Sequence, residues 1–86
     1  MEYNDFFEQL GSKIIDVLRE NDLPYKIHLL DNEIKGMVFE SLVNCKQVCV
    51  DFKPIFDSWE NEDLKDVAGI VVESVNNRFL SEMLES

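Results

Sequence analysis

The sequence predicts a two-layer α+β domain in which two helices cover one face of a three-stranded antiparallel sheet, in the order αβββα. Three observations support this fold class. The first part of the chain has apolar residues at helical spacing, the middle has short alternating apolar segments separated by turn residues, and the last part returns to helical spacing. A chain of 86 residues is long enough for one domain, so we expect residues 1–86 to form a single acidic unit.

The first helix is expected at residues 4–21. Asn21 is predicted to take the left-handed conformation that ends a helix, and Pro24 prevents the helix from continuing. The apolar stripe of this helix consists of Tyr3, Phe6, Phe7, Leu10, Ile14, Val17 and Leu18.

Three strands follow, and Pro54 is expected to end the last of them because proline cannot donate to a strand ladder. The strands are expected at residues 25–30, 34–43 and 46–53, with turns at 31–33 and 44–45.

The alternation of apolar residues also predicts how the strands pair. A two-residue turn at 44–45 would pair Phe39 with Val50 and Met37 with Phe52. The first strand joins the same face only if the first turn holds three residues or if Gly36 carries a bulge. In either case the core face consists of Tyr25, Ile27, Leu29, Met37, Phe39, Val48, Val50 and Phe52.

The last helix is expected at residues 60–84. Its buried stripe is predicted to consist of Leu64, Val67, Ala68, Val71, Val75 and Phe79. Its outer side would carry several carboxylates together with Ile70, Leu80 and Leu84.

This order of elements is similar to that of double-stranded-RNA-binding domains, and the chain length is close to theirs. The resemblance is one of topology only. Those domains place basic residues at the start of the second helix, where they bind phosphates. The matching positions here are Glu60, Glu62, Asp63 and Asp66, and carboxylates there would repel RNA.

The chain is strongly acidic, with 18 acidic and eight basic residues and a net charge of −10. Each half of the chain carries nine acidic and four basic residues, so the acidity belongs to the folded body and not to a tail. Such a field repels nucleic acid and anionic membranes, and it attracts basic protein surfaces. We therefore expect a basic protein partner, with no direct contact to nucleic acid or membrane.

The stretch DSWENEDLKDV at residues 57–67 concentrates this charge, with five carboxylates and one lysine. Carboxylates at a helix start interact favourably with the helix dipole, and this accounts for two or three of them. It does not account for Glu73 on the same outer face or for Asp5, Glu8 and Asp16 on the first helix. The acidic surface is therefore either a solvated face or one that binds a positive partner. Trp59 is either a hydrophobic staple onto the sheet edge or first helix, or an aromatic anchor for that partner. The candidate partner-binding residues are Asp57, Trp59, Glu60, Glu62, Asp63, Asp66 and Glu73.

No residue pattern indicates catalysis or a bound cofactor. His28, Cys45 and Cys49 do not have the spacing of a usual zinc site, and no third residue is placed to orient His28 for a cysteine nucleophile. We expect neither a metal nor a cofactor, and no enzymatic activity. The acidic N-terminus does not look like a signal peptide, so both cysteines are expected to be reduced in a cytoplasmic protein.

Two functions are therefore carried forward. The first is a small acidic inhibitor that blocks a positively charged, nucleic-acid-binding surface of a partner protein, as phage anti-CRISPR and anti-restriction proteins and nuclease immunity proteins do. The alternative is a homodimeric adaptor or chaperone-like module that uses a second apolar face of the sheet, with acidity serving solubility. That self-association face would consist of Leu30, Ile34, Val38 and Leu42.

Overall fold

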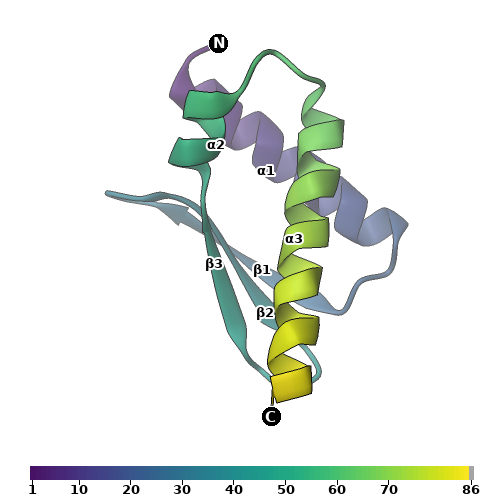
Figure 1. The fold of residues 1–86 in the computed structure, drawn as a ribbon. Helices are drawn as coiled ribbons and strands as arrows, with labels where there is room; N and C mark the ends of the chain where they lie inside the picture. The colour runs from purple at the N-terminus through teal and green to yellow at the C-terminus, as the bar shows by residue number, and fades with distance from the viewer. Residues whose placement is uncertain (86) are drawn as a thin grey trace.

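The computed structural model describes the chain over residues 1–85, with side chains to Glu82. It confirms a two-layer α+β architecture, with one short helix more than the sequence predicts (Figure 1). The elements are α1 (Tyr3–Glu20), β1 (Tyr25–Asp31), β2 (Lys35–Ser41), β3 (Gln47–Asp51), α2 (Phe52–Ser58) and α3 (Leu64–Glu85).

The three strands form an antiparallel sheet in the order β1-β2-β3, so β1 and β3 are its edges. The turn between β1 and β2 holds three residues, as the shared apolar face requires, but it lies at 32–34 and not at 31–33. In β1–β2, Ile27 pairs with Phe39 and Leu29 pairs with Met37. The prediction of a common face for the first two strands is confirmed.

The predicted pairing of β2 with β3 is wrong by two residues. Phe39 pairs with Val48 and not with Val50, because the turn spans residues 42–45. The Ser41 N–H donates to the Lys46 carbonyl at 2.9 Å and closes this longer turn, in which Cys45 has a positive φ of 60°. A shift of two residues leaves every side chain on its original face, so the predicted core face survives the error.

The core lies between the sheet and the helices. Figure 1 shows α1 and α3 on the same side of the sheet, with α1 over the β1 side and α3 over the β3 side. The fully or almost fully buried apolar side chains are Phe6, Phe7, Leu10, Ile14, Leu18, Met37, Phe39, Val48, Phe52, Leu64, Val67, Ala68, Val71, Val72, Val75 and Phe79. Every residue of the predicted α3 stripe is among them.

Leu29 departs from its predicted burial. It lies on the helix-facing side of the sheet, but 57% of its surface is exposed. Leu29 lies beside Gly11 of α1, but its position on edge strand β1 leaves its other side open to solvent. Tyr25, Ile27 and Val50 are half-buried on the same face.

The end of α1 also differs in detail from the expectation. Asp22, with a φ of 49°, takes the left-handed position, whereas Asn21 has a φ of −107°. The Leu23 N–H donates to the Leu18 carbonyl at 3.1 Å, which is the bond of a Schellman cap. The Asn21 side chain instead donates to the Val17 carbonyl.

The short helix α2 replaces the predicted end of the third strand. Strand β3 ends at Asp51, whose carboxylate accepts a hydrogen bond from the Lys53 N–H at 2.9 Å and caps α2. Pro54 lies in the first turn, where the missing N–H costs nothing. Phe52 is therefore a helix residue, although it is fully buried as predicted.

Candidate functional site

The acidic residues predicted at and just before one helix are spread over two helices and the loop between them. Asp57 lies in α2, whereas Glu60, Glu62 and Asp63 precede α3, which begins at Leu64 and not near residue 60. Asp66 and Glu73 lie in α3. All six side chains are exposed. We call these six residues the 57–73 acidic stretch.

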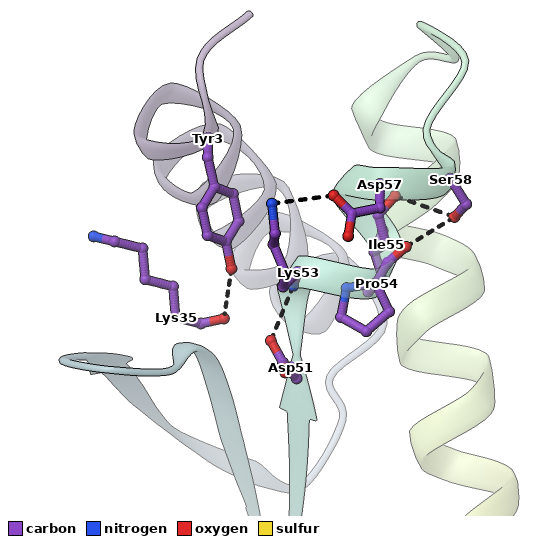
Figure 2. A network of polar contacts seen from close by, with 8 residues as sticks. All are labelled: Tyr3, Lys35, Asp51, Lys53, Pro54, Ile55, Asp57 and Ser58. Atoms are coloured by element: carbon purple, nitrogen blue, oxygen red, sulfur yellow. Dashed lines mark hydrogen bonds and ion pairs between the residues drawn. The ribbon is translucent and has the colours of Figure 1, made fainter.

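Asp57 belongs to a local polar network, shown in Figure 2. Its carboxylate pairs with the Lys53 ammonium at 3.1 Å. The same ammonium lies 5.2 Å from the ring centroid of Tyr3 and 5.4 Å from that of Phe56. The Tyr3 hydroxyl donates to the Lys35 carbonyl at 3.3 Å, which links α1 to the start of β2. Asp57 is therefore already partly neutralised within the protein.

Asp63 has a structural role at the start of α3. Its carboxylate accepts a hydrogen bond from the Lys65 N–H at 2.9 Å, which is the bond expected of an N-cap residue. This agrees with the interpretation that some of these carboxylates serve the helix start.

Lys65 joins α3 to the last turn of α1. Its ammonium donates to the Glu20 carboxylate at 3.0 Å. This hydrogen bond and the charge of Glu20 raise the pKa of Lys65 against an opposing desolvation, and the charges of Asp16 and Asp63 raise it slightly further. Two carboxylates of α1 and the N-cap carboxylate before α3 thus lie around one lysine. We call this group of Asp16, Glu20, Asp63 and Lys65 the acidic corner.

The acidic corner adds Asp16 and Glu20 of α1 to the charged surface of the 57–73 acidic stretch. The sequence alone does not place these two groups of residues together. The spacing of carboxylates along a helix gives their face, but the crossing of α1 and α3 decides which faces meet. The exposed position of Asp16 is predictable from the α1 stripe. Its position near Lys65 of α3 is not.

The outer side of α3 alternates acidic and apolar side chains. Asp66, Ile70, Glu73 and Leu80 fall on one strip because they are separated by three, four or seven residues. Ile70 is 65% exposed and Leu80 is 50% exposed. Glu60, Glu62, Asp66 and Glu73 make no ion pair within the described residues. This strip therefore presents uncompensated charge beside apolar contact area.

Trp59 is half-buried against α1. Its ring centroid lies 5.1 Å from that of Phe6, and its indole N–H donates to the Glu62 carbonyl at 3.0 Å. These contacts correspond to the staple interpretation of Trp59. They also fix the loop that carries Glu60 and Glu62.

The four residues of the predicted self-association face lie in different surroundings. Leu30 and Val38 are half-buried on the sheet face that no helix covers. Ile34 and Leu42 are not strand residues, since they lie in the turns at opposite ends of the sheet. They are 50% and 63% exposed. The strand bounds of 34–43 are thus wrong at both ends, and only Leu30 and Val38 of the apolar column are strand residues.

Cys45 and Cys49 are free and exposed. In the part of the chain that the structure describes, no three His, Cys, Asp or Glu side chains are grouped so that they could hold a metal ion. His28 lies on β1, with its Nε2 3.9 Å from the Glu40 carboxylate. Across residues 1–85, no helix is both long and apolar enough to cross a membrane.

Comparison with known proteins identifies no relative of this chain. No protein-family model, no curated protein and no solved structure matches the chain. The candidate function therefore depends on the charge and geometry described above.

Proposed function

We propose that this protein binds a positively charged surface of another protein and blocks the nucleic-acid contacts of that surface. It acts by binding and not by catalysis. The partner class would be nucleases and other nucleic-acid-binding proteins, and the activity would be of the anti-CRISPR, anti-restriction or nuclease-immunity kind.

The observation that carries this proposal is the uncompensated charge around the start of α3. Asp16 and Glu20 of α1 and the N-cap residue Asp63 lie around Lys65, and Glu60, Glu62, Asp66 and Glu73 have no ionic partner in the described chain. Exposed like charges repel one another and lower stability, so their accumulation is more easily explained by a partner that neutralises them. A group of exposed carboxylates also raises the rate of association with a basic surface.

The exposed apolar residues of α3 support a protein partner over a small cation. Ile70 lies between Asp66 and Glu73 on the outer strip, and burying it would add non-polar contact area to the ionic one. A charged rim around an apolar contact is the usual composition of a protein interface.

Charge removal with a matched control tests the proposal. A triple variant, Glu62→Gln, Asp66→Asn and Glu73→Gln, removes three charges from the 57–73 acidic stretch and spares the Asp63 cap. The control, Glu2→Gln, Asp5→Asn and Glu33→Gln, changes the net charge equally at other exposed positions. A partner captured by crosslinking in host cells provides the binding assay, and displacement of its nucleic acid provides the functional one.

We expect the first variant to bind more slowly and to lose inhibition, and we expect the control to resemble the parent. Affinity of the parent should also fall steeply as salt rises. Equal binding by both variants at low salt would overturn the proposal.

Self-association is a second candidate, because the sheet face that carries Leu30 and Val38 is covered by no helix. Under this candidate, Val38→Glu converts a dimer into a folded monomer, with sedimentation as the measurement. A parent protein that is already monomeric at high concentration would exclude it.

A further inference from the structure

A groove runs along the flank of α1 beside edge strand β1. It consists of two adjoining hollows that share Ile15 and Arg19. One hollow reaches Leu29 and Phe7, and the other reaches Tyr25, Ile27 and Leu23. Its floor is apolar, since the half-buried Ile15 and the exposed Leu29 both line it.

The hydrogen-bond pattern of the sheet shows that β1 has free backbone groups on the side of this groove. The Leu42 N–H donates to the Pro24 carbonyl at 2.9 Å. Because hydrogen-bonded pairs alternate along an antiparallel ladder, the even residues of β1 bond to β2. The N–H and C=O groups of Ile27 and Leu29 therefore point away from the sheet.

The groove and the free edge together form a receptor for an added strand. A strand that pairs with Ile27 and Leu29 would direct every second side chain toward α1, because side chains alternate along a strand. Those side chains would meet the apolar floor at Ile15. The backbone pairing would supply affinity and the floor would select apolar residues at alternate positions.

The rim of the groove defines the charge of the occupant. Glu8 lies at the Leu29 end, Asp22 at the Tyr25 end and Asp16 between them, against the single cation Arg19. A second copy of this chain is disfavoured as the occupant, because it would bring another set of these carboxylates and another net charge of −10.

We propose that edge strand β1 and the adjoining groove bind an extended segment of a basic partner protein by strand addition, with apolar residues at alternate positions and lysine or arginine at its ends. This site shares Asp16 with the acidic corner but contains no residue of the 57–73 acidic stretch, and the peptide experiments below can fail without the inhibitor proposal failing.

The probe is a dye-labelled peptide that matches the seven residues of β1, with valine at alternate positions, threonine between them and lysine at both ends. A peptide of the same composition in scrambled order removes the alternation, and a peptide with glutamate ends reverses the charge. We expect saturable binding of the first peptide only, measured by fluorescence anisotropy. Equal binding of the scrambled peptide would show that the site does not require apolar residues at alternate positions. Equal binding of the glutamate peptide would show that it does not select basic ends.

Two protein variants locate the site. Leu29→Lys places a cation in the groove, and Leu80→Lys makes the same change at a similarly exposed residue on α3. We expect Leu29→Lys to weaken peptide binding by about tenfold or more, the factor expected from losing the burial of one large side chain. Leu80→Lys should leave binding unchanged. Equal effects of the two changes would place the peptide elsewhere.

Hydrogen exchange then tests the pairing itself. The amide hydrogens of Ile27 and Leu29 should exchange more slowly when the peptide is bound, while those of Cys49 on the opposite edge strand should not change. Binding without protection at Ile27 and Leu29 would overturn strand addition. A dimer in sedimentation that Leu29→Lys dissociates would instead make a second copy the occupant, and would overturn the basic partner.

Discussion

Tyr25 stacks on Phe79, with ring centroids 5.0 Å apart and an angle of 24° between the rings. The Tyr25 hydroxyl also donates a hydrogen bond to the Asn76 side-chain oxygen, three residues earlier in α3. The first strand and the last helix are thus joined by one side chain across 51 positions of sequence.

Changing Tyr25 to phenylalanine keeps the stack and removes the hydrogen bond. We expect a loss of about 1 kcal/mol in the free energy of unfolding, measured by urea denaturation at neutral pH. Phe79→Ala should cost about 3–5 kcal/mol because it removes a buried aromatic ring. If Tyr25→Phe lost as much unfolding free energy as Phe79→Ala, the hydroxyl and not the ring stacking would be the main attachment of α3.

The contribution of Tyr25 to stability should depend on pH in the alkaline range. Burial raises the pKa of Tyr25 above its usual value near 10, because the ionised form is disfavoured in the fold. The neutral form therefore stabilises the folded state, and this contribution is complete below the unfolded pKa and lost as pH rises through the folded pKa. The stability difference between the parent and Tyr25→Phe should shrink above about pH 10. A difference that stays constant with pH would contradict this.

Phe39 and Val38 test which face of the sheet is buried. Phe39 is fully buried under the helices, whereas Val38 is half-buried on the uncovered face. We expect Phe39→Ala to cost about 3–5 kcal/mol of unfolding free energy and Val38→Ala to cost clearly less. Comparable losses would mean that a partner or second copy covers the face of Val38 in solution.

Two glycines should respond in opposite directions to the same substitution. A Cβ atom at Gly36 would lie 2.1 Å from the Val50 carbonyl oxygen, so Gly36→Ala forces β2 and β3 apart. A Cβ atom at Gly69 would meet nothing within 4 Å, and alanine is a better helix former than glycine. We expect Gly36→Ala to lower the unfolding free energy by about 1–3 kcal/mol or more and Gly69→Ala to raise it by about 0.5–1 kcal/mol. Thermal unfolding of both variants beside the parent is the measurement.

The sequence was sufficient for the elements whose apolar pattern is long. The α1 and α3 stripes and the common sheet face follow from periodicity alone, and a pairing error of two residues left that face intact. The short helix α2 was missed because seven residues are too few to show a period. Asp51 as a cap and Pro54 in a first turn were the available signals.

The candidate site was less predictable for a different reason. Exposure of Asp66 and Glu73 follows from the α3 stripe, but the meeting of Asp16 and Glu20 with Lys65 depends on how two helices cross. The groove beside β1 depends on how far α1 covers the sheet edge. The pattern of apolar residues along the sequence contains neither the crossing of the helices nor the extent of this cover.

Lys65 provides the last prediction, because it is the one cation of the acidic corner. Lys65→Gln removes the pair with Glu20 and leaves Asp16, Glu20 and Asp63 uncompensated. Stability should fall only slightly, since the pair lies at the surface, where such pairs contribute little.

Association of Lys65→Gln with a basic partner should become faster, since the local field becomes more negative. Lys46→Gln is the matched control, because it makes the same charge change just after the turn between β2 and β3, which lies near the other end of α3 (Figure 1). Stopped-flow association rates at low salt should rise for Lys65→Gln and less for Lys46→Gln. Equal rates for the two variants would mean that only total charge matters and that the acidic corner does not face the partner.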